Sequence, residues 1–96
     1  MQHYILAKFH EGTDVSALLA PVSSIFHPVL SIPGIHSVRI KPSCSDRANR
    51  YDMMIRIDMD REALPAYDAS APHHLWKEQY SNLIEKKAVF DCEDDE

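Results

Sequence analysis

Apolar and polar side chains alternate regularly from Tyr51 to Met59, and this alternation constrains the fold more than any other feature of the sequence. Successive side chains of a β-strand point to opposite faces of a sheet, so the pattern predicts a strand with one buried face. A sheet that buries one face needs a second layer packed against that face. The rest of the chain must therefore supply further strands and a layer of helices.

Three other segments have the composition of strands and lie at positions 3–9, 35–41 and 87–92. After the first of them, Gly12, Thr13 and Asp14 predict a turn and a helix cap. The apolar positions of 15–30 then follow helical spacing. Pro21 and Pro28 interrupt this stretch, so we expect a kinked helix or two short pieces.

The segment between the third and fourth strands is predicted to contain two more helices. Asp60 is placed to cap a short helix that ends at Tyr67, and the second helix begins near Pro72. The inward stripe of this second helix is predicted to consist of Trp76, Tyr80, Leu83 and Ile84.

The resulting order is β-α-β-β-α-β, which predicts an α+β, ferredoxin-like fold: an antiparallel four-stranded sheet with its helices on one face. The first strand is apolar on both sides, with Ile5, Ala7 and Phe9 on one and Tyr4 and Leu6 on the other. Helices cover only one face, so the other exposes apolar surface of the kind that forms interfaces. We therefore expect a homodimer that pairs two sheet faces about a twofold axis.

The 96 residues are expected to form a single domain over 1–96, with 91–96 as an acidic tail. The net charge is −5, and five of the acids fall in the last six residues, so nucleic acid is not expected as a partner. A basic cluster around a loop is interpreted as a solvated face; it comprises Arg39, Lys41, Arg47 and Arg50. With only Gly12 and Gly34 in the chain, no glycine-rich phosphate loop is possible and no cofactor is expected.

No apolar run approaches the length of a membrane span, and the N-terminus lacks the cationic start of a secretory signal. We therefore expect no membrane partner and a cytoplasmic location. Cys44 and Cys92 lie far apart in the sequence and neither belongs to a Cys-x-x-Cys pair. Reduced thiols are expected rather than a disulfide or a zinc site.

Tyr67, His73 and His3 are the candidate catalytic residues. Tyr67 and His73 are six residues apart, and residues six apart on a continuous helix point to nearly opposite sides. A break at Pro72 is what would turn both rings toward one interior. A neutral His73 in the first turn of its helix would then act as a general base, Tyr67 would polarise a carbonyl oxygen, and His3 would orient the substrate or donate a proton.

The same three residues also have a structural interpretation. Tyr67 and His73 are equally consistent with core residues whose polar atoms bond to the backbone or to each other, and His3 with a strand-end histidine. His74 is expected on the surface, because it falls on the other side of the helix from His73.

Metal and nucleophile chemistry have less support in the sequence. His3 and His73 with a carboxylate such as Asp68 would make a metal site, but no His-x-His or His-x3-His spacing occurs among the inward residues. No metal is expected. Ser70 lies near His73 without a nucleophile elbow, and Cys44 falls in a polar loop.

Several short motifs, in this order and over nearly the full length, resemble the stress-responsive A/B barrel (Dabb) family. They are His3-Tyr4-Ile5-Leu6-Ala7-Lys8-Phe9 with Gly12-Thr13, Ile32-Pro33-Gly34-Ile35-His36-Ser37-Val38, Tyr51-Asp52, Arg61-Glu62-Ala63-Leu64-Pro65-Ala66-Tyr67, Pro72-His73 and Val89-Phe90-Asp91. The resemblance implies a dimeric α+β barrel. Members include plant stress proteins and cyclases that close linear polyketide chains.

In the cyclase branch of that family, a strand-one histidine, a helix tyrosine and a histidine six residues later line the pocket. By position these match His3, Tyr67 and His73. Members often carry His-Pro-x-His after the tyrosine, whereas this chain has Ser70 in place of the first histidine and its proline at position 72.

The sequence therefore leads to one main functional hypothesis and two alternatives. The main one is an apolar pocket between sheet and helices that binds a small organic or carbonyl-containing ligand, with cofactor-free acid/base chemistry of the cyclase or lyase type at His3, Tyr67 and His73. The first alternative is a non-catalytic stress-response or ligand-binding module. The second is an oxygen-consuming monooxygenase, for which the sequence offers no positive feature.

Overall fold

The computed structural model describes residues 1–93, and these form one antiparallel sheet of four strands. The strands are β1 (Gln2–Phe9), β2 (Ile35–Pro42), β3 (Met53–Met59) and β4 (Ile84–Cys92). Their order across the sheet is β2-β3-β1-β4, and every neighbouring pair is antiparallel. The ferredoxin-like fold predicted from the sequence is confirmed. Residues 94–96 of the predicted acidic tail lie outside the described residues.

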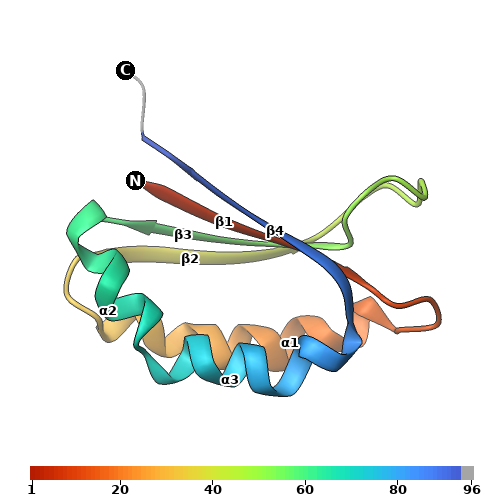
Figure 1. Cartoon of the computed structure of the whole chain (residues 1–96), viewed down its shortest axis with the longest axis horizontal. Coiled ribbons are helices and arrows are strands. Elements are labelled where there is room, and N and C mark those ends of the chain that lie inside the picture. Colours follow the sequence, from red (N-terminus) through yellow and green to blue (C-terminus); the bar gives the residue numbers. More distant parts are fainter. Residues whose placement is uncertain (94–96) are drawn as a thin grey trace.

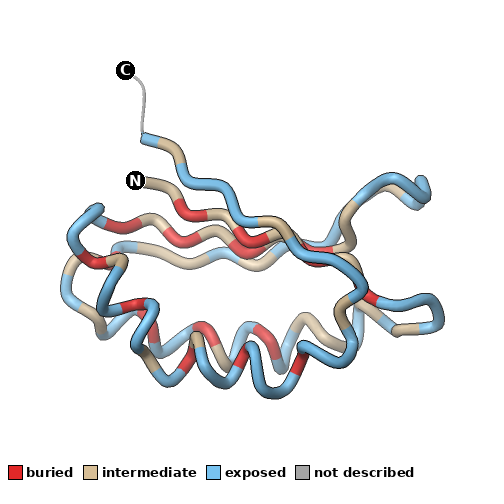
Figure 2. The backbone as a smooth tube through the Cα atoms, viewed as in Figure 1, coloured by how far each residue is buried: buried red, intermediate tan, exposed pale blue. Residues whose placement is uncertain are grey.

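The helices form a layer on one face of this sheet (Figure 1). The α-helices are α1 (Val15–Phe26), α2 (Leu64–Asp68) and α3 (Ala71–Tyr80), and short 3₁₀ turns occupy His27–Ser31, Arg61–Ala63 and Ser81–Leu83. Buried residues lie where the two layers face each other (Figure 2).

Burial alternates along the two central strands, as a one-sided core requires. In β1 the side chains of His3, Ile5, Ala7 and Phe9 are buried against the helices, and the residues between them are half-buried on the other face. The strand β3 repeats the pattern from Met53 to Met59. The edge strand β4 is mostly exposed on both sides.

The two prolines of the first helical stretch behave differently. Pro28 lies in the 3₁₀ turn that follows α1, so the predicted division into two pieces is confirmed there. Pro21 lies inside α1 without ending it. A proline inside a helix costs about 3 kcal/mol, whereas burying a large apolar side chain contributes about 1.5–3 kcal/mol. Val22 and Phe26, both fully buried on the inner side of α1, offset that loss.

The predictions around Asp60 and at the end of α3 need correction. The side chain of Asp60 does not cap the following helix; its Oδ1 lies 3.0 Å from Nε2 of His36. The last predicted helix ends at Tyr80 rather than reaching Ile84, which begins β4. Leu83 is exposed, because the chain must turn there to enter the edge strand.

Candidate functional site

The structure brings His3, Tyr67 and His73 together in one cluster between the sheet and the helices. The ring centroids of His3 and Tyr67 are 5.4 Å apart, and those of Tyr67 and His73 are 5.0 Å apart. Both pairs meet edge to face, a favourable arrangement for aromatic rings. The three residues come from β1, α2 and α3, so the fold unites positions far apart in the sequence.

His3 is oriented by Asp91, a residue that the sequence placed in the last strand and at the start of the acidic tail but not in the site. The two residues are directly opposite each other in the β1–β4 ladder. Nδ1 of His3 lies 2.5 Å from Oδ1 of Asp91. A carboxylate only accepts hydrogen bonds, so Nδ1 carries the proton, and in the neutral ring Nε2 is the acceptor. The sequence shows an acid on the last strand and a histidine on the first, but their pairing follows from the β1–β4 register, which only the structure gives.

Tyr67 is the most enclosed member of the cluster. Its side chain is fully buried, and its hydroxyl has no hydrogen-bond partner within residues 1–93. Burial, with a smaller contribution from the negative charge of Asp68, raises the pKa of Tyr67 above its ordinary value. The hydroxyl therefore stays protonated at physiological pH and is a hydrogen-bond donor without an acceptor.

His73 is held by Ser70, the second residue whose role the sequence did not reveal. Ser70 caps α3: its Oγ accepts a hydrogen bond from the backbone N–H of His73 and donates one, 2.6 Å long, to the carbonyl oxygen of Tyr67. One hydroxyl thus joins the end of α2 to the start of α3. The serine that stands where the resembling family often has histidine fixes the backbone between Tyr67 and His73.

The imidazole of His73 is neutral under ordinary conditions. Burial lowers the pKa of His73, and the positive charge of Lys77 lowers it further, while Asp68 acts in the opposite direction. Nδ1 of His73 is buried and has no hydrogen-bond partner within the described part of the chain. The adjacent His74 is exposed, as the helical phase predicted.

The open hollow expected around these residues is not what the geometry shows. Tyr67 is fully enclosed and its ring touches both histidine rings, so the cluster is packed. His73, whose ring lies against that of Tyr67, is the half-buried member of the cluster. Two polar atoms without partners inside a packed cluster are uncommon, because buried polar groups in proteins nearly always form hydrogen bonds.

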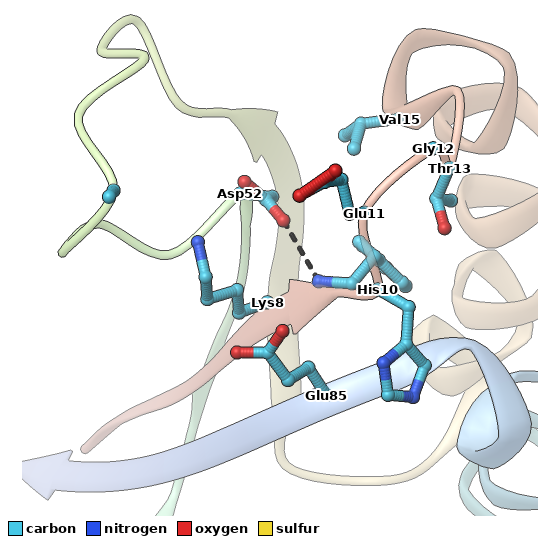
Figure 3. Close-up of a pocket in the computed structure, with 10 residues that line it drawn as sticks. Lys8, His10, Glu11, Gly12, Thr13, Val15, Asp52 and Glu85 are labelled. Atoms are coloured by element: carbon cyan, nitrogen blue, oxygen red, sulfur yellow. Dashed lines mark hydrogen bonds between the residues drawn. The ribbon is translucent and has the colours of Figure 1, made fainter.

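A separate cavity of about 380 Å³ lies at the other end of β1 (Figure 3). Carboxylates from three parts of the chain line it together with Lys8: Glu11, Asp52 and Glu85. Asp52 has a structural role there, because its Oδ2 accepts a 2.8 Å hydrogen bond from the backbone N–H of Phe9. Sequence analysis did not identify this cavity, since its lining residues share no motif.

Within residues 1–93, histidine, cysteine and carboxylate side chains do not gather in threes as a metal site requires. Over the same residues, each helix is too short or too polar to cross a lipid bilayer.

Comparison with known proteins identifies the fold. No model of a known protein family matches the sequence, and no curated protein sequence matches it. Solved structures, in contrast, share its fold. A dimeric protein of unknown function with a ferredoxin-like fold from Bacteroides fragilis superposes with a TM-score of 0.78 at 11% identity, over 96% of this chain and 93% of that one.

Two further structures are relevant to the family resemblance. A protein from Arabidopsis thaliana has a TM-score of 0.78 at 17% identity, over 99% of this chain and 95% of that one. A Dabb-family protein with a ferredoxin-like fold from Mesorhizobium loti has a TM-score of 0.67 at 14% identity, over 93% and 90%. The chain thus has the fold of that Dabb protein, as the resemblance implied.

Proposed function

We propose that the protein is a homodimer of the α+β barrel type that binds a small carbonyl-containing ligand at the cluster of His3, Tyr67 and His73, and that it catalyses cofactor-free acid/base chemistry on this ligand. The observation that carries the proposal is a pair of buried atoms, Tyr67 Oη and His73 Nδ1, that have no hydrogen-bond partner among residues 1–93. A ligand that accepts a hydrogen bond from the first and donates a proton to the second would satisfy both.

The protonation states of the two groups fit this chemistry. A tyrosine whose pKa is raised by burial donates to a carbonyl oxygen and stabilises the negative charge that develops on it. A histidine whose pKa is lowered remains an unprotonated base near neutral pH. Together they would remove a proton alpha to a carbonyl while stabilising the enolate, with His3 held in one tautomer by Asp91.

Ligand entry requires a local movement. Because Tyr67 Oη is buried, a neighbouring side chain has to move before a ligand atom reaches the hydroxyl, and we assign this movement to the half-buried ring of His73, which contacts Tyr67. Side-chain rotation of this kind is fast compared with typical turnover. The packed cluster is then the resting form of the site.

The dimer rests on two supports. In the described part of the chain no layer covers the sheet face opposite the helices, and Phe90, 61% exposed, lies on that face beside Tyr4. The similar protein from Bacteroides fragilis is described as dimeric. Pairing two such faces would cover the apolar side chains of β1, β3 and β4 that water now contacts.

Exchange of α-protons for deuterium tests the chemistry without knowledge of the natural substrate. Cyclohexanone and S-ethyl thioacetate, incubated in deuterated buffer and followed by proton NMR, should exchange faster with the wild-type protein than with His73→Gln or Tyr67→Phe. His74→Gln, which changes the exposed neighbour, is the matched control and should keep the wild-type rate. Equal rates for all four proteins would remove the proposed mechanism.

The competing function is a non-catalytic module in which the cluster only stabilises the fold. It is favoured by the ring-to-ring packing of the three residues. It predicts that His73→Gln and Tyr67→Phe change the free energy of unfolding and leave no exchange activity to lose.

A further inference from the structure

The open face of the sheet carries an exposed ring on β4 and an apolar hollow beside β1, β2 and β3. The projecting ring is Phe90 on β4, the most exposed of the large apolar side chains in residues 1–93. It is opposite Tyr4 in the β1–β4 ladder, and the two ring centroids are 6.4 Å apart. Tyr4 supports Phe90 from one side only, so most of its surface faces outward.

The hollow has a volume of about 310 Å³ and lies where β1, β2 and β3 approach the loop between β2 and β3. Leu6 and Met54, whose side chains alternate away from the helices, line it together with Pro42, Cys44 and Tyr51. Lys41 also lines the hollow. An aromatic ring would fit such a site, because its edges pack on apolar groups and its face attracts an ammonium group.

We infer that Phe90 of one copy of this chain occupies the hollow of Leu6, Met54 and Tyr51 in a second copy, and that this contact is made twice. The inference rests on the proposed homodimer and assigns its anchor. In a twofold dimer the same surface of each copy forms the contact. A projecting ring and a hollow on that surface can therefore pair twice, with the ring of each copy in the hollow of the other. A twofold axis lying between the faces, midway between projection and hollow, brings both pairs together.

A second copy fits this face better than a nucleic acid strand does. Arg39, Lys41, Arg56 and Lys86 also lie on the open face, and cations next to aromatic rings suit single-stranded nucleic acid. Arg56 is already paired with Asp58 and stands 5.8 Å from the Tyr4 ring, and Lys86 stands 5.7 Å from the ring of Tyr51. These contacts place a cation over one face of the Tyr4 ring and one face of the Tyr51 ring, where bases would stack, whereas Phe90 and the Leu6 and Met54 side of the hollow carry no such contact within residues 1–93.

Neighbouring residues of β4 provide a matched test. Val89 and Phe90 are similarly exposed, at 53% and 61%, but alternate to opposite faces of the sheet. Sedimentation equilibrium should show that Phe90→Asp raises the dimer dissociation constant by about 100-fold or more, as for a buried anchor residue, and that Val89→Asp leaves it unchanged. Phe90→Ala, which adds no charge, should weaken the dimer in the same direction, and circular dichroism checks that each variant is folded.

Cys44 reports on occupancy of the hollow. In a Cys92→Ser background, Cys44 is the remaining thiol, and it is exposed in the single chain. Its rate of reaction with a disulfide reagent should fall as protein concentration rises through the dimer dissociation constant. In Phe90→Ala, compared with wild type at the same fraction of dimer, Cys44 should no longer be protected from the reagent.

The outcomes separate the two proposals. A wild-type chain that is monomeric at all concentrations, or that is monomeric and binds a short single-stranded RNA on this face, overturns both the dimer and its anchor. A stable dimer that is indifferent to Phe90→Asp, with Cys44 equally reactive at every concentration, overturns the anchor and leaves the dimer standing.

Discussion

Two hydrogen-bonding atoms, Tyr67 Oη and His73 Nδ1, are buried at the junction of α2 and α3 without a partner in residues 1–93. Leaving a donor or acceptor buried and unsatisfied costs about 1–3 kcal/mol. Neighbouring hydrogen bonds hold the cluster in place: the Ser70 hydroxyl bonds to the backbone of both Tyr67 and His73, and Asp91 bonds to His3. The two unpaired atoms therefore lower the stability of the fold, and they are the same atoms to which the proposed function assigns the chemistry.

Replacement of Asp91 by asparagine tests how His3 is held. The amide can still accept a hydrogen bond from Nδ1 but loses the negative charge, so Asp91→Asn should lower the free energy of unfolding by about 1 kcal/mol. Urea denaturation measures the change. Glu93→Gln, which removes a more exposed carboxylate near Arg61, is the control and should have an effect under about 0.5 kcal/mol. Equal effects would mean that the His3–Asp91 bond contributes nothing specific.

Acid should destabilise the protein through His73. Its pKa in the folded state lies below the ordinary value of 6.5, so the unfolded chain binds a proton more readily. This contribution to stability is complete above pH 6.5 and is lost as the pH falls toward the folded pKa. The groups that act on the ring are Lys77, Asp68, His74 and Lys87. Unfolding between pH 7 and 5 should show a smaller loss in His73→Gln than in wild type, and an unchanged slope would contradict the lowered pKa.

At the scale of elements, the junctions matter more than the helices and strands themselves. Ser70→Ala removes the cap of α3 and its bond to Tyr67, and it should cost about 1 kcal/mol in chemical denaturation. Ser24→Ala, an exposed position inside α1, should change stability by less than about 0.5 kcal/mol. A harmless Ser70→Ala would show that α3 begins correctly without its cap.

Gly12 and Gly34 have nearly the same φ but different surroundings, so replacing each by alanine distinguishes backbone strain from steric contact. Gly12 and Gly34 have φ of 90° and 92°, a region that disfavours other residues by roughly 1–2 kcal/mol. A Cβ at Gly12 would meet nothing within 4 Å, whereas one at Gly34 would lie 3.1 Å from the Cβ of Ala63. Gly34→Ala should therefore lower the thermal midpoint more than Gly12→Ala. Equal midpoints would mean that the turn before β2 has room to shift.

The sequence predicted helices and strands well where the periodic spacing of apolar side chains determines them. It predicted less where contacts between distant segments decide the structure. The alternation of 51–59 and the stripe of α1 follow from local pattern, and the structure shows a strand over Met53–Met59, two residues shorter at its start, and the helix α1. Asp60 was placed as a cap because its residue type favours one, but His36 on the neighbouring strand competes for its carboxylate. The tie between His3 and Asp91 depends on the register of β1 and β4, which no local pattern encodes.

For the site, the sequence predicted that three rings lie near one another, but it did not predict how buried they are or which residues hold them. The encounter of His3, Tyr67 and His73 followed from the family resemblance and from the break before α3. That Tyr67 would be fully enclosed, and that Ser70 would join its carbonyl to α3, depends on how α2 packs under the sheet.

At the scale of the whole molecule, one face of the sheet is covered by helices and the other is not (Figure 1). If the open face binds a second copy, folding and association are linked, and the thermal midpoint should rise with protein concentration. Differential scanning fluorimetry over a hundred-fold range of concentration would detect the rise. Phe90→Asp should abolish the dependence, and Val89→Asp should keep it. A wild-type midpoint independent of concentration would contradict the linkage.

The most direct test of the central proposal observes the cluster while a ligand binds. In protein labelled with carbon-13 at histidine, titration with cyclohexanone should shift the ring signals of His73 in a saturable way, and should leave those of the adjacent, exposed His74 in place. Tyr67→Phe, which removes the donor to the carbonyl, should abolish saturation. If His73 and His74 respond alike, or if neither responds up to the solubility limit of the ketone, the cluster does not bind this class of ligand.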